Sequence, residues 1–281
     1  MKLLISGEGP RDLGTCNNAQ GQCSDGDFNR GPMTVWLVRL WEALLGYNLL
    51  DTPEAVVYVS EHSLAQKAKE SGKRMQSLRG KKQESETGLY FSNAKCLGLM
   101  AKQLAEDHDD PVMAVLFRDA DGTRSAPGQM WQTKWDSMVN GFASVTFKFG
   151  VPMLPKPKSE AWLLCAAQTG NHSHAALENI SGNDDAPNSA KKQWDALMGN
   201  PQTAAQEVNW CTDQPTDWQN LLTMPSFKAF YERFHLSQMQ FFVLLEGLYD
   251  FSDMENRPLE STKKAQQPRR HAHHHGPERW L

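Results

Sequence analysis

Short apolar runs alternate with longer segments of helical pattern along the first part of the chain. The apolar runs lie at residues 2–6, 55–60, 112–117, 145–149 and 151–154. The helical segments lie at residues 32–45, 92–106, 128–140 and 159–167. Continuous apolar strands that alternate with helices are typical of a parallel sheet covered on both faces. The pattern therefore predicts an α/β fold with a parallel sheet and flanking helices.

The chain changes character after this alternating part, and we expect three regions. Residues 1–195 would form the sheet-containing domain, 196–250 a C-terminal helical appendage, and 251–281 a polar, His-rich disordered tail. Further helices are expected at 189–198 and 227–249. The polar segments 14–32 and 170–190 are expected to be long loops.

Composition limits the functions that such a fold can serve. Hydrophobic residues make up 40% and charged residues 22% of the 281 positions, which excludes wholesale disorder. The net charge of −4 means that a nucleic-acid contact would need a local basic patch or bound metal. We find no apolar run long enough to cross a membrane. The five scattered cysteines favour reduced thiols and a cytoplasmic location.

Acidic residues follow several of the apolar runs. Glu8 comes after the first run, Asp119 and Asp121 follow the run at 112–117, and Glu160 opens the helix after the last. Parallel strands place their carboxyl ends along one edge of a sheet, where ligands bind. Carboxylates suit hard divalent cations, and Mg²⁺ completes its shell with waters and phosphate oxygens. Alone, an Asp-x-Asp-Gly segment is usually a loop turn. Several acidic residues in this order, each after an apolar run, are a more specific signal of a metal site.

Together these motifs resemble the Toprim domain, which topoisomerases, primases, a ribosomal-RNA maturase and the OLD nucleases share. Residues 8–12, Glu-Gly-Pro-Arg-Asp, look like the OLD-type pattern Glu-Gly-x-x-Glu/Asp, and residues 119–121 match the Asp-x-Asp. Residues 159–164, Ser-Glu-Ala-Trp-Leu-Leu, resemble a helix start of a Toprim-like family often encoded beside ATPases in bacterial defence loci. Residues 182–183 and 186–192 are similar to that family too.

The resemblance implies a Toprim (Rossmann-like) fold and a metal-dependent endonuclease that uses Mg²⁺ or Mn²⁺. It implies that metal is held by Glu8, Asp12, Asp119, Asp121 and Glu160. A lysine would offset charge in the transition state. Lys191 is preferred over Lys192, while Lys156 and Lys158 stay open. The implied catalytic set is Glu8, Asp119, Asp121, Glu160 and Lys191.

Basic residues suited to a nucleic-acid backbone occur in two places. One is the stretch 67–82, and the other flanks the Asp-x-Asp. The candidate contacts are Lys67, Lys69, Lys73, Arg74, Arg79, Lys81, Lys82, Arg118 and Arg124. A run of charges is more often a solvated surface, and the arginines beside the Asp-x-Asp would then be solvated strand ends.

Two functions are compatible with these observations. The first is a Toprim nuclease that cuts DNA or RNA as the effector of a bacterial anti-phage system, together with an ATPase partner. The second is a non-catalytic Toprim-like scaffold or binding subunit of an ATPase complex, with one structural ion. The apolar segment 227–249 would contact the partner or, more simply, pack onto the sheet. A homo-oligomer is compatible with both functions.

Overall fold

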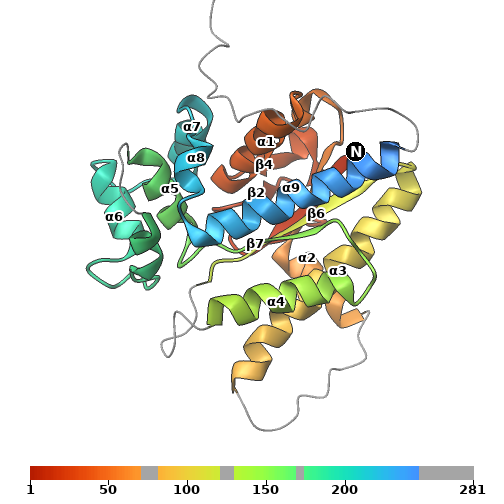
Figure 1. The fold of residues 1–281 in the computed structure, drawn as a ribbon, viewed down its shortest axis with the longest axis horizontal. Coiled ribbons are helices and arrows are strands. Elements are labelled where there is room, and N and C mark those ends of the chain that lie inside the picture. Colours follow the sequence, from red (N-terminus) through yellow and green to blue (C-terminus); the bar gives the residue numbers. More distant parts are fainter. Residues whose placement is uncertain (71–81, 121–129, 169–173, 247–281) are drawn as a thin grey trace, which may run out of the picture.

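A computed structural model describes residues 1–70, 82–120, 130–168 and 174–246, with the side chains of 82–86, 174–175 and 241–246 left out (Figure 1). Its centre is a five-stranded sheet of order β3-β5-β1-β6-β7. The strands are β1 (Lys2–Gly7), β3 (Gln22–Ser24), β5 (Val56–Ser60), β6 (Val112–Phe117) and β7 (Gly150–Met153). Strands β5, β1, β6 and β7 run parallel, and β3 is antiparallel to β5. The predicted α/β fold with a largely parallel sheet is confirmed.

Alternating side chains of the strands feed two hydrophobic cores, one on each face of the sheet. Leu3 and Ile5 of β1 join the core that contains α1 (Pro32–Leu45) and the C-terminal helices. Leu4 joins the opposite core. That core is covered by α2 (Glu61–Glu70), α3 (Lys82–His108) and α4 (Met130–Ala143). Helices thus cover both faces, as continuous apolar strands require (Figure 1).

The C-terminal region is helical and shares its core with the sheet. Its elements are α5 (Ser159–Ala167), η3 (His174–Asn179), α6 (Ala190–Leu197), α7 (Ala204–Asp213), α8 (Trp218–Leu221) and α9 (Pro225–Glu246). Phe227, Phe230 and Phe234 of α9 are buried, and Arg233 Nε donates to the Gly150 carbonyl on β7 at 3.0 Å. The long apolar helix therefore packs onto the sheet. The proposed tail at 251–281 lies outside the described residues.

The segment expected to be a long loop at 14–32 contains short ordered elements. Strands β2 (Gly14–Cys16) and β4 (Phe28–Arg30) form a hairpin around β3 and the turn η1 (Asp25–Asp27), and η2 (Leu49–Asp51) follows α1. A disulfide joins Cys16 to Cys23. The expectation of reduced thiols is therefore wrong for this pair. The pairing could not be predicted, because the three-residue strands that bring the two cysteines together have no clear sequence pattern. Cys96, Cys165 and Cys211 are free and buried.

The strand expected at 145–149 is absent, because the chain turns there as α4 ends. The amides of Val145 and Thr146 donate back to the carbonyls of Phe142 and Ala143, and Thr146 has a φ of 54°. A left-handed residue at this position breaks an extended run. The fourth parallel strand is β7 instead. None of the helices in the described ranges combines the length and apolarity needed to cross a lipid bilayer.

Candidate functional site

The carboxyl ends of β1 and β6 meet where the chain order of the sheet reverses. The chain passes from β1 to β5 on one side and then returns to β6 on the other side. Open α/β sheets bind ligands in the crevice outside such a switch point. The two strand ends are very close, because a Cβ on Gly7 would lie 2.0 Å from the Phe117 carbonyl oxygen. Glycine at the end of β1 therefore brings Glu8 beside the residues that follow β6, and the Glu8 amide donates to the Phe117 carbonyl at 3.2 Å.

Ser159, the first residue of α5, connects three of the predicted acidic residues. Its amide donates to Oδ1 of Asp119 at 3.1 Å, and its hydroxyl donates to Oδ1 of Asp12 at 2.5 Å. The hydroxyl oxygen also lies 3.5 Å from Oε2 of the neighbouring Glu160. The Asp119 carboxylate thus accepts a hydrogen bond at the N-terminus of a helix, where the helix dipole favours negative charge. We call Asp12, Asp119 and Glu160, gathered around Ser159, the acidic cluster.

Burial makes ionisation costly in the acidic cluster. The pKa of Asp12 is raised to about 7, mainly by burial and in part by the nearby Glu160, although the Ser159 hydrogen bond opposes the shift. Burial also raises the pKa of Glu160. Neighbouring carboxylates that are desolvated together resist full ionisation unless positive charge is supplied. The acidic cluster is therefore short of positive charge.

The donor chemistry of the acidic cluster fits a hard divalent cation, since carboxylate oxygens are the ligands that Mg²⁺ and Mn²⁺ prefer. A bound cation would also supply the missing positive charge. Within the described residues, however, no three His, Cys, Asp or Glu side chains already converge as a group that could hold a metal ion. Asp121, another of the predicted ligands, lies outside the described residues. Waters and phosphate oxygens usually fill the other positions around Mg²⁺.

Glu8 faces a buried arginine. Nη2 of Arg118 lies 2.9 Å from Oε2 of Glu8, and its Nη1 lies 3.1 Å from Oε1 of Glu61, the first residue of α2. The Arg118 side chain is only 8% exposed. The alternative that Arg118 is a solvated strand end is therefore wrong, and a phosphate contact by this residue stays a prediction. Arg124 lies outside the described residues.

Lys134 of α4 is a functional candidate that the sequence reasoning missed. Its side chain is fully buried, and its Nζ donates to the Ala120 carbonyl at 3.2 Å. The same ammonium lies 5.2 Å from the ring centre of Tyr90, whose hydroxyl donates to the Asp119 carbonyl at 3.2 Å. Lys134 and Tyr90 therefore fix the backbone at Asp119 and Ala120 through their hydrogen bonds to these two carbonyls. A signal was present, because Lys134 falls on the apolar stripe of α4, four residues before the buried Met138.

The candidate lysines lie at different places around the acidic cluster. Lys158 directly precedes Ser159, and its charge lowers the pKa of Glu160 in opposition to the larger effect of burial. Nζ of Lys158 lies 3.0 Å from Oδ1 of Asp184, and Nζ of Lys191 lies 3.9 Å from the other oxygen of that carboxylate. Lys192 donates to a backbone carbonyl instead. Lys158 is thus the candidate lysine whose charge acts on Glu160, and it shares the Asp184 carboxylate with Lys191.

The predicted basic stretch lies only partly within the described residues. Lys67 and Lys69 are exposed on α2, and Nζ of Lys67 lies 3.4 Å from Oε1 of Gln22. Lys82 begins α3, but its side chain is not described. Lys73, Arg74, Arg79 and Lys81 lie outside the described residues. Helix α2 belongs to the face of the sheet opposite α1.

A second unpredicted feature ties the acidic cluster to the C-terminal helices. Arg11, the neighbour of Asp12, forms a bidentate pair with Glu207 of α7, with distances of 3.1 Å from Nε and 2.6 Å from Nη2. Glu207 is buried and also accepts a hydrogen bond from Nε1 of Trp194 at 3.2 Å. Bidentate arginine–carboxylate pairs fix orientation as well as distance. The pairing was not visible in the sequence because the two residues are far apart along the chain.

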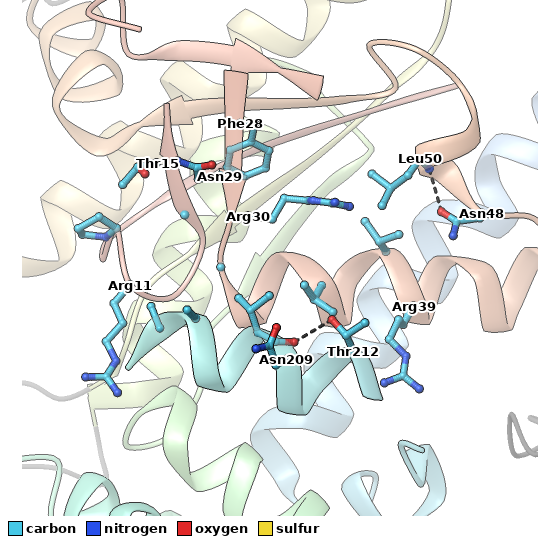
Figure 2. A pocket seen from close by; sticks show the side chains of 18 of the residues that line it. Arg11, Thr15, Phe28, Asn29, Arg30, Arg39, Asn48, Leu50, Asn209 and Thr212 are labelled. Carbon is cyan, nitrogen blue, oxygen red and sulfur yellow. Dashed lines mark hydrogen bonds between the residues drawn. The ribbon is translucent and has the colours of Figure 1, made fainter. Parts of the chain in front are cut away.

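Beside Arg11 lies a cavity of about 810 Å³ between the β2–β4 hairpin, α1 and α7 (Figure 2). Its lining combines arginine and asparagine side chains with apolar residues of α1 and α7.

Compared with protein-family models, with curated proteins and with solved structures, the chain shows no significant match.

Proposed function

We propose that the protein is a Toprim-type, metal-dependent nuclease that hydrolyses phosphodiester bonds. The observation that carries the proposal is the acidic cluster: Asp12, Asp119 and Glu160 meet around Ser159 beyond the carboxyl edge of the sheet. Burial leaves this cluster short of positive charge, which a divalent cation would supply. The position beside the switch point between β1 and β6 is where α/β sheets bind ligands.

In this proposal the residues of the chain have distinct roles. Asp12, Asp119 and Glu160 hold Mg²⁺ or Mn²⁺, with Asp121 and Glu8 as further ligands. When bound, such an ion activates water and stabilises charge on the phosphate. Lys158 or Lys191 offsets the charge that develops in the transition state. Ser159 orients Asp12 and Asp119 through its hydroxyl and amide groups.

The cellular role that we propose follows from the resemblance of residues 159–164 to a family encoded beside ATPases. The nuclease would act in the cytoplasm as the effector of an anti-phage system, and an ATPase partner would restrain it. The packing of α9 onto β7 accounts for much of the apolar surface of that helix without a partner. The partner's contact surface is therefore left unassigned.

A cleavage assay tests the proposed activity. Purified protein would be mixed with plasmid, single-stranded DNA and tRNA in the presence of Mg²⁺ or Mn²⁺. We expect cleavage that EDTA stops, and a loss of about 100-fold or more in Asp119→Asn and Glu160→Gln, which keep the shape of each side chain. Asp107→Asn, on the exposed part of α3, is the matched control and should cut like the wild type. Cleavage that survives both substitutions would contradict the site.

One observation favours the alternative, a non-catalytic scaffold or binding subunit that holds one structural ion. Glu8 is engaged by Arg118, and the described side chains do not already form a closed ligand set. In that case the protein would bind Mn²⁺, and Glu160→Gln would abolish the binding. No substrate would be cut by the wild type, even with the ATPase partner and its trigger present.

A further inference from the structure

Two lysines from neighbouring helices converge on one carboxylate. Nζ of Lys158 lies 3.0 Å from Oδ1 of Asp184, and Nζ of Lys191 lies 3.9 Å from Oδ2 of the same side chain. Lys158 immediately precedes α5, and Lys191 is the second residue of α6, which packs against α5 (Figure 1). The fold thus brings two ammonium groups to the two oxygens of one anion. We call Lys158 and Lys191 the lysine pair.

The lysine pair lies next to the candidate metal site. Lys158 directly precedes Ser159, which donates hydrogen bonds to two carboxylates of the acidic cluster. Burial is the main cause of the raised pKa of Glu160, the charge of Lys158 lowers that pKa, and the charge of Asp184 raises it. An anion held by the lysine pair would therefore lie beside the acidic cluster, where a metal-dependent nuclease must place a phosphate group.

The backbone of both lysines is held by helix contacts that do not involve Asp184. The Lys158 carbonyl accepts a hydrogen bond from the Ala161 amide at 3.0 Å at the start of α5. Its side chain is only 16% exposed, which limits the positions that the ammonium can take. Lys191 lies in the first turn of α6, which the side chain of Ser189 caps. The lysine pair is therefore positioned by the fold and does not need the carboxylate between its members.

The carboxylate of Asp184 is weakly held in comparison. Its side chain is 45% exposed, and ion pairs at exposed positions contribute little to stability. The loop around it is shaped by other contacts. The Asn183 amide donates to the Ser181 hydroxyl and the Asp185 amide donates to the Asn183 side chain, both at 3.2 Å. The Ala190 amide donates to the Ser181 carbonyl at 3.0 Å. The carboxylate can therefore turn away while the loop keeps its shape.

A phosphodiester group can replace the Asp184 carboxylate between the two lysines. It carries the same single negative charge and presents two oxygens in a similar fork, and lysine is a common ligand of phosphate. A phosphate at this position can also interact with a divalent cation in the acidic cluster, since Mg²⁺ accepts phosphate oxygens in its shell. The additional interaction would favour the substrate over Asp184.

We propose that the lysine pair binds one phosphate group of the nucleic acid, and that the Asp184 carboxylate occupies this site until the substrate displaces it. The inference rests on the proposed nuclease function and adds a contact within the chain that limits substrate binding. The apparent affinity of a site falls in proportion to the fraction of molecules in which the site is open. Removal of the Asp184 charge should therefore raise the affinity for phosphate.

Titration with inorganic phosphate tests this proposal without any cleavage. Isothermal titration calorimetry would be carried out in EDTA at constant ionic strength. Asp184→Asn keeps the shape of the side chain and removes its charge. Asp185→Asn is the matched control, because Asp185 is an exposed acid of the same loop whose main-chain carbonyl is the acceptor for Lys192. We expect Asp184→Asn to raise the phosphate affinity about fivefold or more, and Asp185→Asn to change it less than about twofold.

The gain in affinity must depend on the lysine pair. Lys158→Met or Lys191→Met, added to Asp184→Asn, should each cancel the gain. Lys191 is the more exposed of the two, at 35%, so its replacement is the safer choice for folding. Circular dichroism checks that each variant is folded. A gain that persists in both double variants would contradict the assignment of the site.

Other outcomes would also overturn the inference. They are a phosphate affinity of Asp184→Asn that equals the wild-type value, a gain no larger than that of Asp185→Asn, and a loss, which would mean that Asp184 is needed to hold the lysines. Labelled DNA and RNA strands, titrated in EDTA by fluorescence anisotropy, should show the same gain. A gain confined to inorganic phosphate would reject nucleic acid as the ligand.

Failure of the nuclease function gives a different result from failure of this inference. If the protein is not a nuclease, no strand is cut in Mg²⁺, while the gain in phosphate affinity of Asp184→Asn remains. If both proposals hold, Asp184→Asn should cut with a lower KM than the wild type. Cleavage by the wild type, together with an unchanged KM and phosphate affinity in Asp184→Asn, would reject the inference alone.

Discussion

Asp12 is a half-buried carboxyl whose pKa differs from its ordinary value. Its pKa of about 7 in the folded protein exceeds the value near 3.9 of an unfolded chain. Between these values the folded state holds a proton that the unfolded state has lost. The free energy of unfolding therefore falls as pH rises from about 4 to about 7, and it changes no further above that range. A bound divalent cation would favour the ionised form and reverse this dependence.

Asp12→Asn should remove this contribution while it keeps the shape of the side chain. In EDTA, the wild-type melting temperature should decrease between pH 5 and pH 7.5, and Asp12→Asn should show a smaller decrease over the same range. Thermal melts followed by circular dichroism at several pH values give the comparison. Asp107→Asn, which changes an exposed acid, should keep the wild-type slope. Equal slopes for Asp12→Asn and the wild type would show that Asp12 does not titrate in this range.

Lys134 is the residue whose role most needs a mutational test. Lys134→Met keeps the length of the side chain but removes the hydrogen bond to the Ala120 carbonyl and the contact with the Tyr90 ring. Since these contacts hold the backbone behind Asp119, we expect Mn²⁺ affinity to fall by about 10-fold or more. Isothermal titration calorimetry measures the affinity, with Lys102→Met on the exposed side of α3 as control. Wild-type affinity in Lys134→Met would exclude a positioning role.

At the scale of elements, α7 is the piece that joins the C-terminal region to the site. Its N-terminus carries a capping box in which Thr203 and Gln206 exchange hydrogen bonds. The Arg11–Glu207 pair then fixes α7 against the segment between β1 and α1. The same helix lines the cavity beside Arg11. Loss of this pair should therefore lower the stability of the folded protein.

Glu207→Gln tests that link and still offers Trp194 a hydrogen-bond acceptor. We expect a loss of about 1–3 kcal/mol in the free energy of unfolding. The estimate is below that for a fully buried pair, because the Arg11 side chain is 33% exposed. Urea unfolding measures the change, with Glu232→Gln, from an exposed pair on α9, as control. A loss no larger than that of the control would mean that the pair does not hold α7.

The elements that could be predicted from the sequence are those with a long, regular pattern. The predicted bounds of α1 and α5 coincide with those in the structure, and so do those of β6. The short strands β2, β3 and β4 could not be predicted, since three residues carry no periodicity. Their pairing depends on contacts with β5 and on the Cys16–Cys23 disulfide. Helix α7 was missed although its capping box is visible in the sequence.

At the scale of the whole molecule, the topology determines which acidic residues can meet. Because β1 lies between β5 and β6, the residues after these three strands share one edge. The sequence pattern predicts that Glu8 and Asp119 lie at this edge. Which carboxylates are paired could not be predicted, because pairing depends on side chains from distant segments. Arg118 forms an ion pair with Glu8, and Ser159 donates hydrogen bonds to Asp12 and Asp119.

In the proposed function, Asp12, Asp119 and Glu160 form a divalent-cation site. The most direct measurement is an anomalous difference map from crystals grown with millimolar Mn²⁺. We predict a peak about 2.1 Å from oxygens of these carboxylates, and its loss in Glu160→Gln crystals under the same conditions. An empty cluster in well-ordered wild-type crystals that bind Mn²⁺ elsewhere would contradict the claim, and so would a peak that persists unchanged in the variant.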